Sequence, residues 1–235
     1  MKKHTRVLVF ISCFLVLFLT GVVFAETKPA AVIILDASGS MWGKAGNETK
    51  IEAARKVLAE IVPALPDSLE TGFVAFGHRK EGDCNDIEIL VPIGSGNREE
   101  IVKKARSLKP KGKTPLALSV ELVADTLKAR DADTTILMIS DGKDTCSTDP
   151  CAVVKKLKES GIRFVLHVVG FDVQDDESEQ LRCMANAGGG EYYAADDTES
   201  LLAAFKEMQK SVEKSLVVVP AETKTVGRKT SLAKV

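Results

Sequence analysis

The chain has 235 residues, 45% of them hydrophobic, and its 32 basic and 33 acidic side chains give a formal net charge of −1. This length suits one ordinary α/β domain with short extensions, and it is enough to bury a sizeable core. Without residues 1–25, 29 basic groups stand against 33 acidic ones and the net charge becomes −4. Such a mildly acidic surface argues against nucleic acid as a partner.

The N-terminus has the pattern of an export signal. Lys2, Lys3 and Arg6 precede an apolar run over residues 7–24, and residues 23–25 read Val-Phe-Ala, as at a signal peptidase site. We therefore expect residues 1–25 to be a signal peptide cleaved after Ala25, and the protein to be periplasmic or secreted. The run is longer than a typical signal core, so the alternative is an inner-membrane anchor formed by residues 7–24. Contact with a membrane is expected only through this segment.

Strand-like and helix-like runs alternate along the rest of the chain. Runs rich in β-branched or aromatic residues predict strands at residues 31–36, 71–76, 87–93, 134–139, 162–170 and 191–195. Helical periodicity and capping residues predict helices at residues 49–61, 98–108, 114–128, 149–161, 176–187 and 198–214. Asn97 is expected to cap the second helix, and Thr114, followed by a proline, the third.

This alternation predicts a doubly wound α/β fold, with a mainly parallel six-stranded sheet and helices on both of its faces. The linker at residues 77–86 is too short for a helical crossover. The second and third strands should therefore form an antiparallel hairpin, with the third strand at the sheet edge. We expect one domain at residues 26–214. For the tail at 215–235, an extra strand, a linker and a truncated second domain are the alternatives.

The strongest functional signal is a set of oxygen-bearing side chains near the ends of two predicted strands. Asp36 ends the first strand, and Ser38 and Ser40 follow at alternate positions, where extended side chains point the same way. Asp141 follows the fourth strand, and Thr114 begins a helix at the same edge of the sheet. These segments should meet at the switch point where open α/β sheets bind ligands. Mg²⁺ prefers such oxygen donors, and the same set would accept Mn²⁺ or Ca²⁺.

This five-residue pattern resembles the metal-ion-dependent adhesion site of von Willebrand factor A domains. The stretches DASGSMWG (36–43), KPKGKTPL (109–116) and VVGFD (168–172) are also similar to exported bacterial members of that family. The resemblance implies that Ser38 and Ser40 ligate the ion directly, and that Thr114, Asp36 and Asp141 do so directly or through water. It also implies a binding module without catalytic activity, whose metal ion coordinates a carboxylate of a protein partner. The oligomeric state is not specified by the sequence.

An enzyme is the rival interpretation. A Mg²⁺-dependent phosphatase of the haloacid dehalogenase type also places an Asp after its first strand, but its acid–base residue two positions later is an Asp, and here it is Ser38. A serine hydrolase would need a His base and a nucleophile elbow, which neither His78 nor His167 accompanies. The chain contains no phosphate-binding glycine loop.

Four cysteines remain after the signal peptide, which favours disulfides in an oxidising compartment. Proximity in sequence slightly favours Cys146 with Cys151, which leaves Cys84 with Cys183. The serious alternative is Cys84 with Cys146 and Cys151 with Cys183. A zinc site is less favoured because the spacing is not that of a ligand knuckle and no His is near.

Several residues beside the motif have two open interpretations. Trp42 either is exposed beside the metal as an apolar anchor or packs in the core. His78 either lines the ligand surface or hydrogen-bonds a loop, and His167 is expected to be a satisfied strand residue. A basic rim that attracts an acidic ligand, or ordinary solvated side chains, are the alternatives for Lys111, Lys113, Lys143 and Arg79.

Overall fold

The structure is a computed structural model that describes residues 28–130, 132–147 and 149–217. The predicted signal peptide at residues 1–25 and most of the tail at 215–235 lie outside these described residues. Helix α6 continues to Val217, three residues beyond the domain boundary expected at residue 214. Among the described residues, no helix combines the length and the apolar character needed to cross a membrane.

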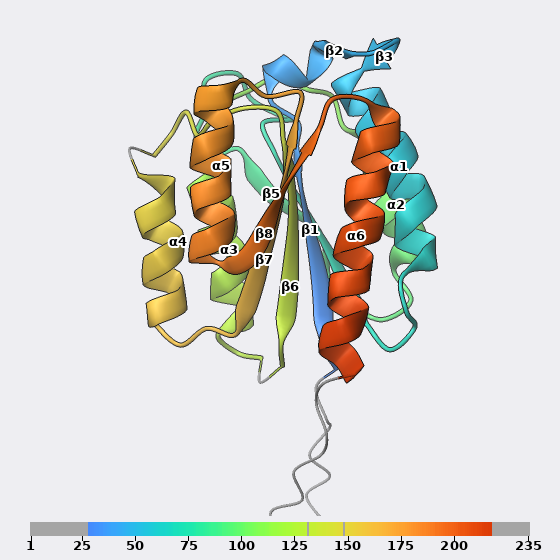
Figure 1. Ribbon diagram of the computed structural model, residues 1–235, viewed down its shortest axis with the longest axis vertical. Coiled ribbons are helices and arrows are strands. Elements are labelled where there is room, and N and C mark those ends of the chain that lie inside the picture. The colour runs from blue at the N-terminus through green and yellow to red at the C-terminus, as the bar shows by residue number, and fades with distance from the viewer. Residues whose placement is uncertain (1–27, 131, 148, 218–235) are drawn as a thin grey trace, which may run out of the picture.

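A single six-stranded sheet forms the centre of the molecule, in the order β5-β4-β1-β6-β7-β8 (Figure 1). Its strands are β1 (Ala30–Asp36), β4 (Glu70–Phe76), β5 (Ile87–Gly94), β6 (Thr134–Ser140), β7 (Phe164–Phe171) and β8 (Gly189–Ala195). Only β5 runs antiparallel to its neighbour, and it lies at the edge. The predicted doubly wound fold with one antiparallel edge hairpin is therefore confirmed.

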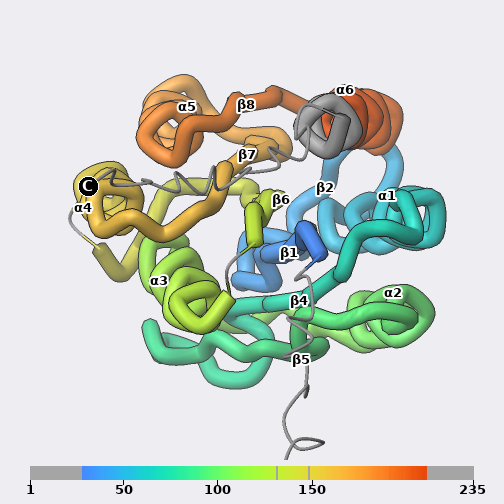
Figure 2. The backbone as a smooth tube through the Cα atoms, turned by 90° about the horizontal axis from the view of Figure 1, so that it is seen from below, coloured from blue at the N-terminus to red at the C-terminus, as the bar shows by residue number. Residues whose placement is uncertain are grey.

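Two layers of helices cover the sheet. Helices α1 (Lys50–Ala64), α2 (Arg98–Ser107) and α6 (Thr198–Val217) pack on one face, and α3 (Leu116–Leu127), α4 (Pro150–Glu159) and α5 (Asp175–Ala187) on the other, as Figure 2 shows from below. Strand β1 is buried on both sides, with Ile33 and Leu35 in the first core and Val32 and Ile34 in the second. This two-sided burial explains why β1 is apolar without alternation.

Three short elements that the sequence did not predict connect β1 to α1. They are the 3₁₀ turn η1 (Gly39–Trp42) and the strands β2 (Lys44–Ala45) and β3 (Glu48–Thr49), which pair as a hairpin. In Figure 1 this hairpin lies at the top of the molecule, at the opposite end from the point where the chain enters β1. The motif after β1 is therefore at the end of the sheet far from the N-terminal segment.

The side-chain capping expected at two helices is absent, and one of the two cap positions also differs. The N-cap of α3 is Pro115 rather than Thr114, and its side chain caps nothing. Instead the amide of Ala117 donates to the carboxylate of Asp144, which comes from the loop after β6, at 2.8 Å. Asn97 is the N-cap residue of α2, as predicted, but its side chain caps no amide there, because its Oδ1 accepts from the hydroxyl of Thr71 while its Nδ2 donates to the carbonyls of Thr71 and Pro92. Long-range polar partners displaced the local capping bonds in both cases.

Two disulfides join Cys84 to Cys146 and Cys151 to Cys183. The slightly favoured pairing of Cys146 with Cys151 is therefore wrong, and the alternative pairing is present. Cys151 lies in the first turn of α4 and is bonded across to α5, whereas Cys146 lies in the preceding loop and is bonded to the β4–β5 loop. With all four thiols in disulfides, the zinc interpretation is also excluded.

Candidate metal-binding site

The carboxyl ends of β1 and β6 bring Asp36 and Asp141 together. These strands are neighbours in parallel register, with Leu35 opposite Ile139, so the residues that follow them meet at one edge. Both carboxylates are buried, Asp36 at 0% and Asp141 at 4% exposure. Asp36 accepts hydrogen bonds from the amide of Ser38 at 2.7 Å and from the hydroxyl of Ser140 at 2.6 Å.

The hydroxyls of the predicted serine ligands form a hydrogen-bonded row that ends at Asp141. The hydroxyls of Ser38 and Ser40 share a hydrogen bond at 3.0 Å, and Ser40 donates to Oδ1 of Asp141 at 2.7 Å. In an octahedral Mg²⁺ site with ligands at about 2.1 Å, neighbouring ligand oxygens are separated by about 3.0 Å. The spacing of these oxygens thus matches the edge of such an octahedron.

Thr114 lies on a loop whose backbone runs beside the motif. Ser38 forms a parallel bridge with Gly112, and the amide of Gly39 donates to the carbonyl of Gly112 at 3.2 Å. The backbone of Thr114 is held on both sides by Thr145, whose hydroxyl accepts from the Thr114 amide at 2.9 Å and whose amide donates to the Thr114 carbonyl at 3.0 Å. Within the described part of the chain, the Thr114 hydroxyl has no hydrogen-bond partner, so its oxygen is available as a ligand.

Gly112 is required for this loop to approach. A Cβ atom built there would lie 2.4 Å from the backbone carbonyl oxygen of Lys80, well inside van der Waals contact. The amides of Lys111 and Gly112 both donate to the carbonyl of Gly77, at 2.9 and 2.8 Å. Hydrogen bonds therefore join the motif segment, the 77–86 loop and the 109–114 loop into one unit.

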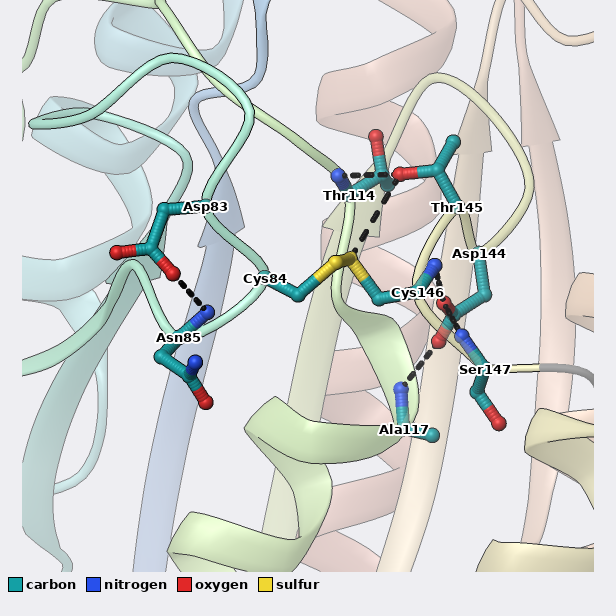
Figure 3. The surroundings of a disulfide bond; sticks show 9 residues. All are labelled: Asp83, Cys84, Asn85, Thr114, Ala117, Asp144, Thr145, Cys146 and Ser147. Carbon is teal, nitrogen blue, oxygen red and sulfur yellow. Dashed lines mark hydrogen bonds between the residues drawn. A yellow bond between two sulfur atoms is a disulfide. The ribbon is translucent and has the colours of Figure 1, made fainter.

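The Cys84–Cys146 disulfide fastens this unit to the loop that follows Asp141 (Figure 3). In that loop, Oδ1 of Asp144 accepts from the amides of Cys146 and Ser147 at 2.6 and 2.7 Å, while its other oxygen binds the first turn of α3. Cys146 is adjacent in sequence to Thr145, which holds Thr114. The disulfide thus lies one residue from the group that positions a predicted ligand.

The electrostatics of the two carboxylates favour a cation. Burial, and then the neighbouring charge of Asp141, raise the pKa of Asp36 to about 7. Burial also raises the pKa of Asp141, although hydrogen bonds from Ser40 and the charge of Lys50 oppose the rise. Two buried acids at one point are costly to ionise together, and a divalent ion between them would remove that cost.

Lys50 and Asp172 belong to the site but were not predicted. The ammonium group of Lys50 lies 3.2 Å from Oδ2 of Asp141 and 3.1 Å from Oδ2 of Asp172. It also donates to the carbonyl of Asp172 at 3.0 Å, and Asp172 has a positive φ of 53°. Lys50 is the first residue of α1, so its place in the sequence resembles that of an ordinary exposed helix residue.

The structure also decides the residues left open by the sequence. Trp42 is 51% exposed, and its indole NH donates to the carbonyl of Pro110 at 2.9 Å, so the core interpretation is wrong. His78 is largely buried and its ring contacts Glu88 at 3.1 Å, so it makes a structural hydrogen bond, although to strand β5 rather than to a loop. His167 is buried and accepts from the amide of Glu191 at 3.1 Å, as expected for a satisfied strand residue.

Two of the four residues of the predicted basic rim form ion pairs with acids of this chain. The guanidinium of Arg79 pairs with Asp86 at 2.6 Å, and Lys143 pairs with Asp176 at 3.2 Å. Lys111 and Lys113 are exposed and have no ion-pair partner among the described residues.

The donor set is that of a hard cation. Among the described residues, no group of three or more His, Cys, Asp or Glu side chains could hold a metal ion. The arrangement instead combines two carboxylates with hydroxyls, which suits Mg²⁺ because that ion uses only one or two carboxylates.

Fold and site together define a doubly wound α/β domain with a cluster of acidic and hydroxyl groups at its topological switch point. The von Willebrand factor type A domain family matches residues 31–211, and the chain belongs to this family. A curated relative, the uncharacterized protein YwmD of Bacillus subtilis (strain 168), is 31% identical over 203 residues, covering 81% of this chain and 91% of YwmD.

Solved structures show the same fold at lower identity. The pilus adhesin SpaC from Lactobacillus rhamnosus GG matches with a TM-score of 0.66 and 15% identity, over 81% of this chain and 31% of SpaC. The von Willebrand factor domain of the type V pili tip protein Mfa5 from Porphyromonas gingivalis matches with a TM-score of 0.62 and 14% identity, over 80% of this chain and 96% of that domain.

Proposed function

We propose that this protein binds a divalent cation, preferably Mg²⁺, and uses it to bind a carboxylate of a protein partner. The ligands are Asp36, Ser38, Ser40, Thr114 and Asp141. The bound ion supplies a hard Lewis acid with a coordination position that the chain leaves open, and an anionic oxygen is its preferred occupant. The protein is then a metal-dependent binding module of the cell envelope and catalyses no reaction.

One observation carries this proposal. Two buried carboxylates from neighbouring strands lie beside Ser38 and Ser40. The oxygen–oxygen distances are 3.0 Å from Ser38 to Ser40 and 2.7 Å from Ser40 to Asp141, and the Ser38 amide donates to Asp36 at 2.7 Å. Hydrogen bonding within the fold would not by itself require two acids at one buried point, because burying them costs stability. Coordination of a divalent ion gives both acids and both hydroxyls a common role.

An envelope location agrees with the predicted export signal and with the disulfides, which persist in oxidising compartments. Two proteins of the same fold are named as a pilus adhesin and a pili tip protein, which supports a role in binding at the cell surface.

The rival phosphatase mechanism has less support. It would use Asp36 as the nucleophile and would need a second acid as proton donor. Asp141, the nearest acid, already accepts from Ser40 and faces the ammonium group of Lys50. Hydrolysis of p-nitrophenyl phosphate that depends on Mg²⁺ and is lost in Asp36→Asn would establish the rival.

Isothermal titration with Mg²⁺, Mn²⁺ and Ca²⁺ tests the metal site. Wild type should bind one ion, and Asp36→Asn and the double variant Ser38→Ala/Ser40→Ala should not. Ser95→Ala is the matched control, because Ser95 is exposed and distant in sequence from the motif. Equal binding by all four proteins, with circular dichroism showing that all are folded, would refute the site.

A further inference from the structure

The surface beside the metal site carries a fixed, exposed aromatic ring. Trp42 is the only large apolar side chain that is exposed among the described residues. It lies two residues after Ser40, and its hydrogen bond to the carbonyl of Pro110 holds the indole against the 109–114 loop. The entropy of ordering this ring is therefore already lost in the free protein, as in a preorganised binding anchor.

Two lysines of the 109–114 loop, against which the indole of Trp42 is held, are exposed to solvent. The Cβ direction at Gly112 faces the neighbouring 77–86 loop, toward the carbonyl of Lys80. Along an extended segment neighbouring side chains alternate in direction, so Lys111 and Lys113 face outward. Both are exposed, and the Lys111 amide is fixed to the carbonyl of Ala37 at 3.1 Å, directly beside the motif.

The acids of the neighbouring 77–86 loop leave these lysines largely uncompensated. Asp86 is buried and paired with Arg79 at 2.6 Å, and Asp83 lies 3.6 Å from the ammonium group of Lys80. Glu81 is the one acid of that loop without a cationic partner among the described residues. The surface therefore combines an apolar ring with an excess of positive charge.

We propose that Trp42, Lys111 and Lys113 form a recognition surface for an acidic peptide segment. In this segment a large apolar residue stands within a few positions of the carboxylate that reaches the metal ion. The apolar side chain packs on the indole of Trp42, and further acidic residues pair with the lysines. This inference rests on the proposed metal-dependent binding function and specifies its partner.

The probe is a phage-displayed library of random heptapeptides, panned on the full chain with Mg²⁺ and eluted with EDTA. Enriched peptides should contain Asp or Glu with a nearby Trp, Phe, Tyr, Leu or Met. Trp42 is the only tryptophan of the chain, so binding of a synthetic enriched peptide should change its fluorescence. Replacing the apolar residue of the peptide by Ala should weaken binding at least about tenfold and abolish that change.

Variants of the protein complete the test. Trp42→Ala should lose at least about tenfold in peptide affinity while binding Mg²⁺ as wild type does, and Trp42→Phe should lose less. Lys111→Ala/Lys113→Ala should slow association and reduce its salt dependence, because rim charges act mainly on the encounter rate. Lys155→Ala/Lys156→Ala, on exposed positions of α4, removes the same charge elsewhere and should have no effect.

The outcomes separate the two proposals. If the peptide and its Ala derivative bind equally, or Trp42→Ala binds as wild type while Asp36→Asn does not bind, the recognition surface is wrong and the metal-dependent function stands. If no peptide is eluted by EDTA, or if Asp36→Asn binds the enriched peptides normally, both proposals fail.

Discussion

The two disulfides offer a controlled test of how the proposed metal site is held. Cys84→Ser/Cys146→Ser removes the link between the 77–86 loop and the loop carrying Thr145. Cys151→Ser/Cys183→Ser removes a link between α4 and α5. Thr145 holds Thr114 on both sides, so only the first variant should change the position of a proposed metal ligand.

The expected losses of stability are similar. In the chain-entropy model, a closed loop of 62 residues contributes about 4.3 kcal/mol to the free energy of unfolding, and one of 32 residues about 3.7 kcal/mol. The difference is about 0.6 kcal/mol, which is smaller than the scatter of measured disulfide contributions. The variants therefore form a matched pair in stability.

Their metal affinities should differ. Loss of the outer partners that orient ligands typically weakens metal binding tenfold to a hundredfold, so we expect at least about a tenfold loss in Cys84→Ser/Cys146→Ser. Cys151→Ser/Cys183→Ser should bind Mg²⁺ within about twofold of wild type, since its disulfide touches no ligand-bearing loop. Urea unfolding measures the stabilities, and Mg²⁺ titration calorimetry at a temperature where all three proteins are folded measures the affinities. Equal affinities in the two variants would refute the argument that the first disulfide positions Thr114.

Three further substitutions test separate features. Burial lowers the pKa of His167 below 6.5, so its neutral ring contributes stability above pH 6.5 that is lost as the pH falls. The stability advantage of wild type over His167→Gln in urea titrations should therefore shrink from about pH 7.5 to about pH 5.5. A constant difference between the two proteins would contradict this. Gly112→Ala places a methyl group against the carbonyl of Lys80 and should weaken Mg²⁺ binding at least about tenfold by calorimetry, whereas unchanged affinity would show that the loop can move. Lys50→Met leaves Asp141 without its cation and should cost about 3 kcal/mol of stability in EDTA. Mg²⁺ should then raise its melting temperature more than that of wild type, and an equal rise would exclude competition between the ammonium group and the metal ion.

Most of the fold could be predicted because the long helices show the helical period and the long strands are runs rich in β-branched or aromatic residues. β1 is a run of seven buried residues, and α1 begins at a capping box formed by Thr49 and Glu52. The β4–β5 hairpin followed from the length of its linker alone. Elements of two to four residues, such as η1, β2 and β3, carry no detectable period and were missed. β8 begins at Gly189 rather than at the predicted residue 191, because glycines read as a turn and not as a strand.

The clustering of the candidate ligands was predictable as far as the sequence motif extends. Asp36, Ser38 and Ser40 alternate along one segment, and the parallel pairing of β1 with β6 places Asp141 beside them. The same logic did not find Lys50, because its contact with Asp141 depends on how the η1 and β2–β3 segment returns the chain to the start of α1. Nearness in sequence also favoured the wrong disulfide pairing. Cys146 lies in a loop and Cys151 in the first turn of α4, and each is bonded to a different neighbouring segment.

The candidate site differs from the rest of the molecule because its buried residues are not those that would best stabilise the fold. Elsewhere apolar residues fill the two cores, whereas at the switch point the chain buries two acids whose pKa values are raised by that burial. Apolar residues of similar volume at Asp36 and Asp141 would often stabilise such a fold. Departures from local rules of this kind are expected at functional sites, where another requirement outweighs stability. The requirement that fits two acids, three hydroxyls and an oxygen spacing of 3.0 Å is coordination of a hard divalent ion.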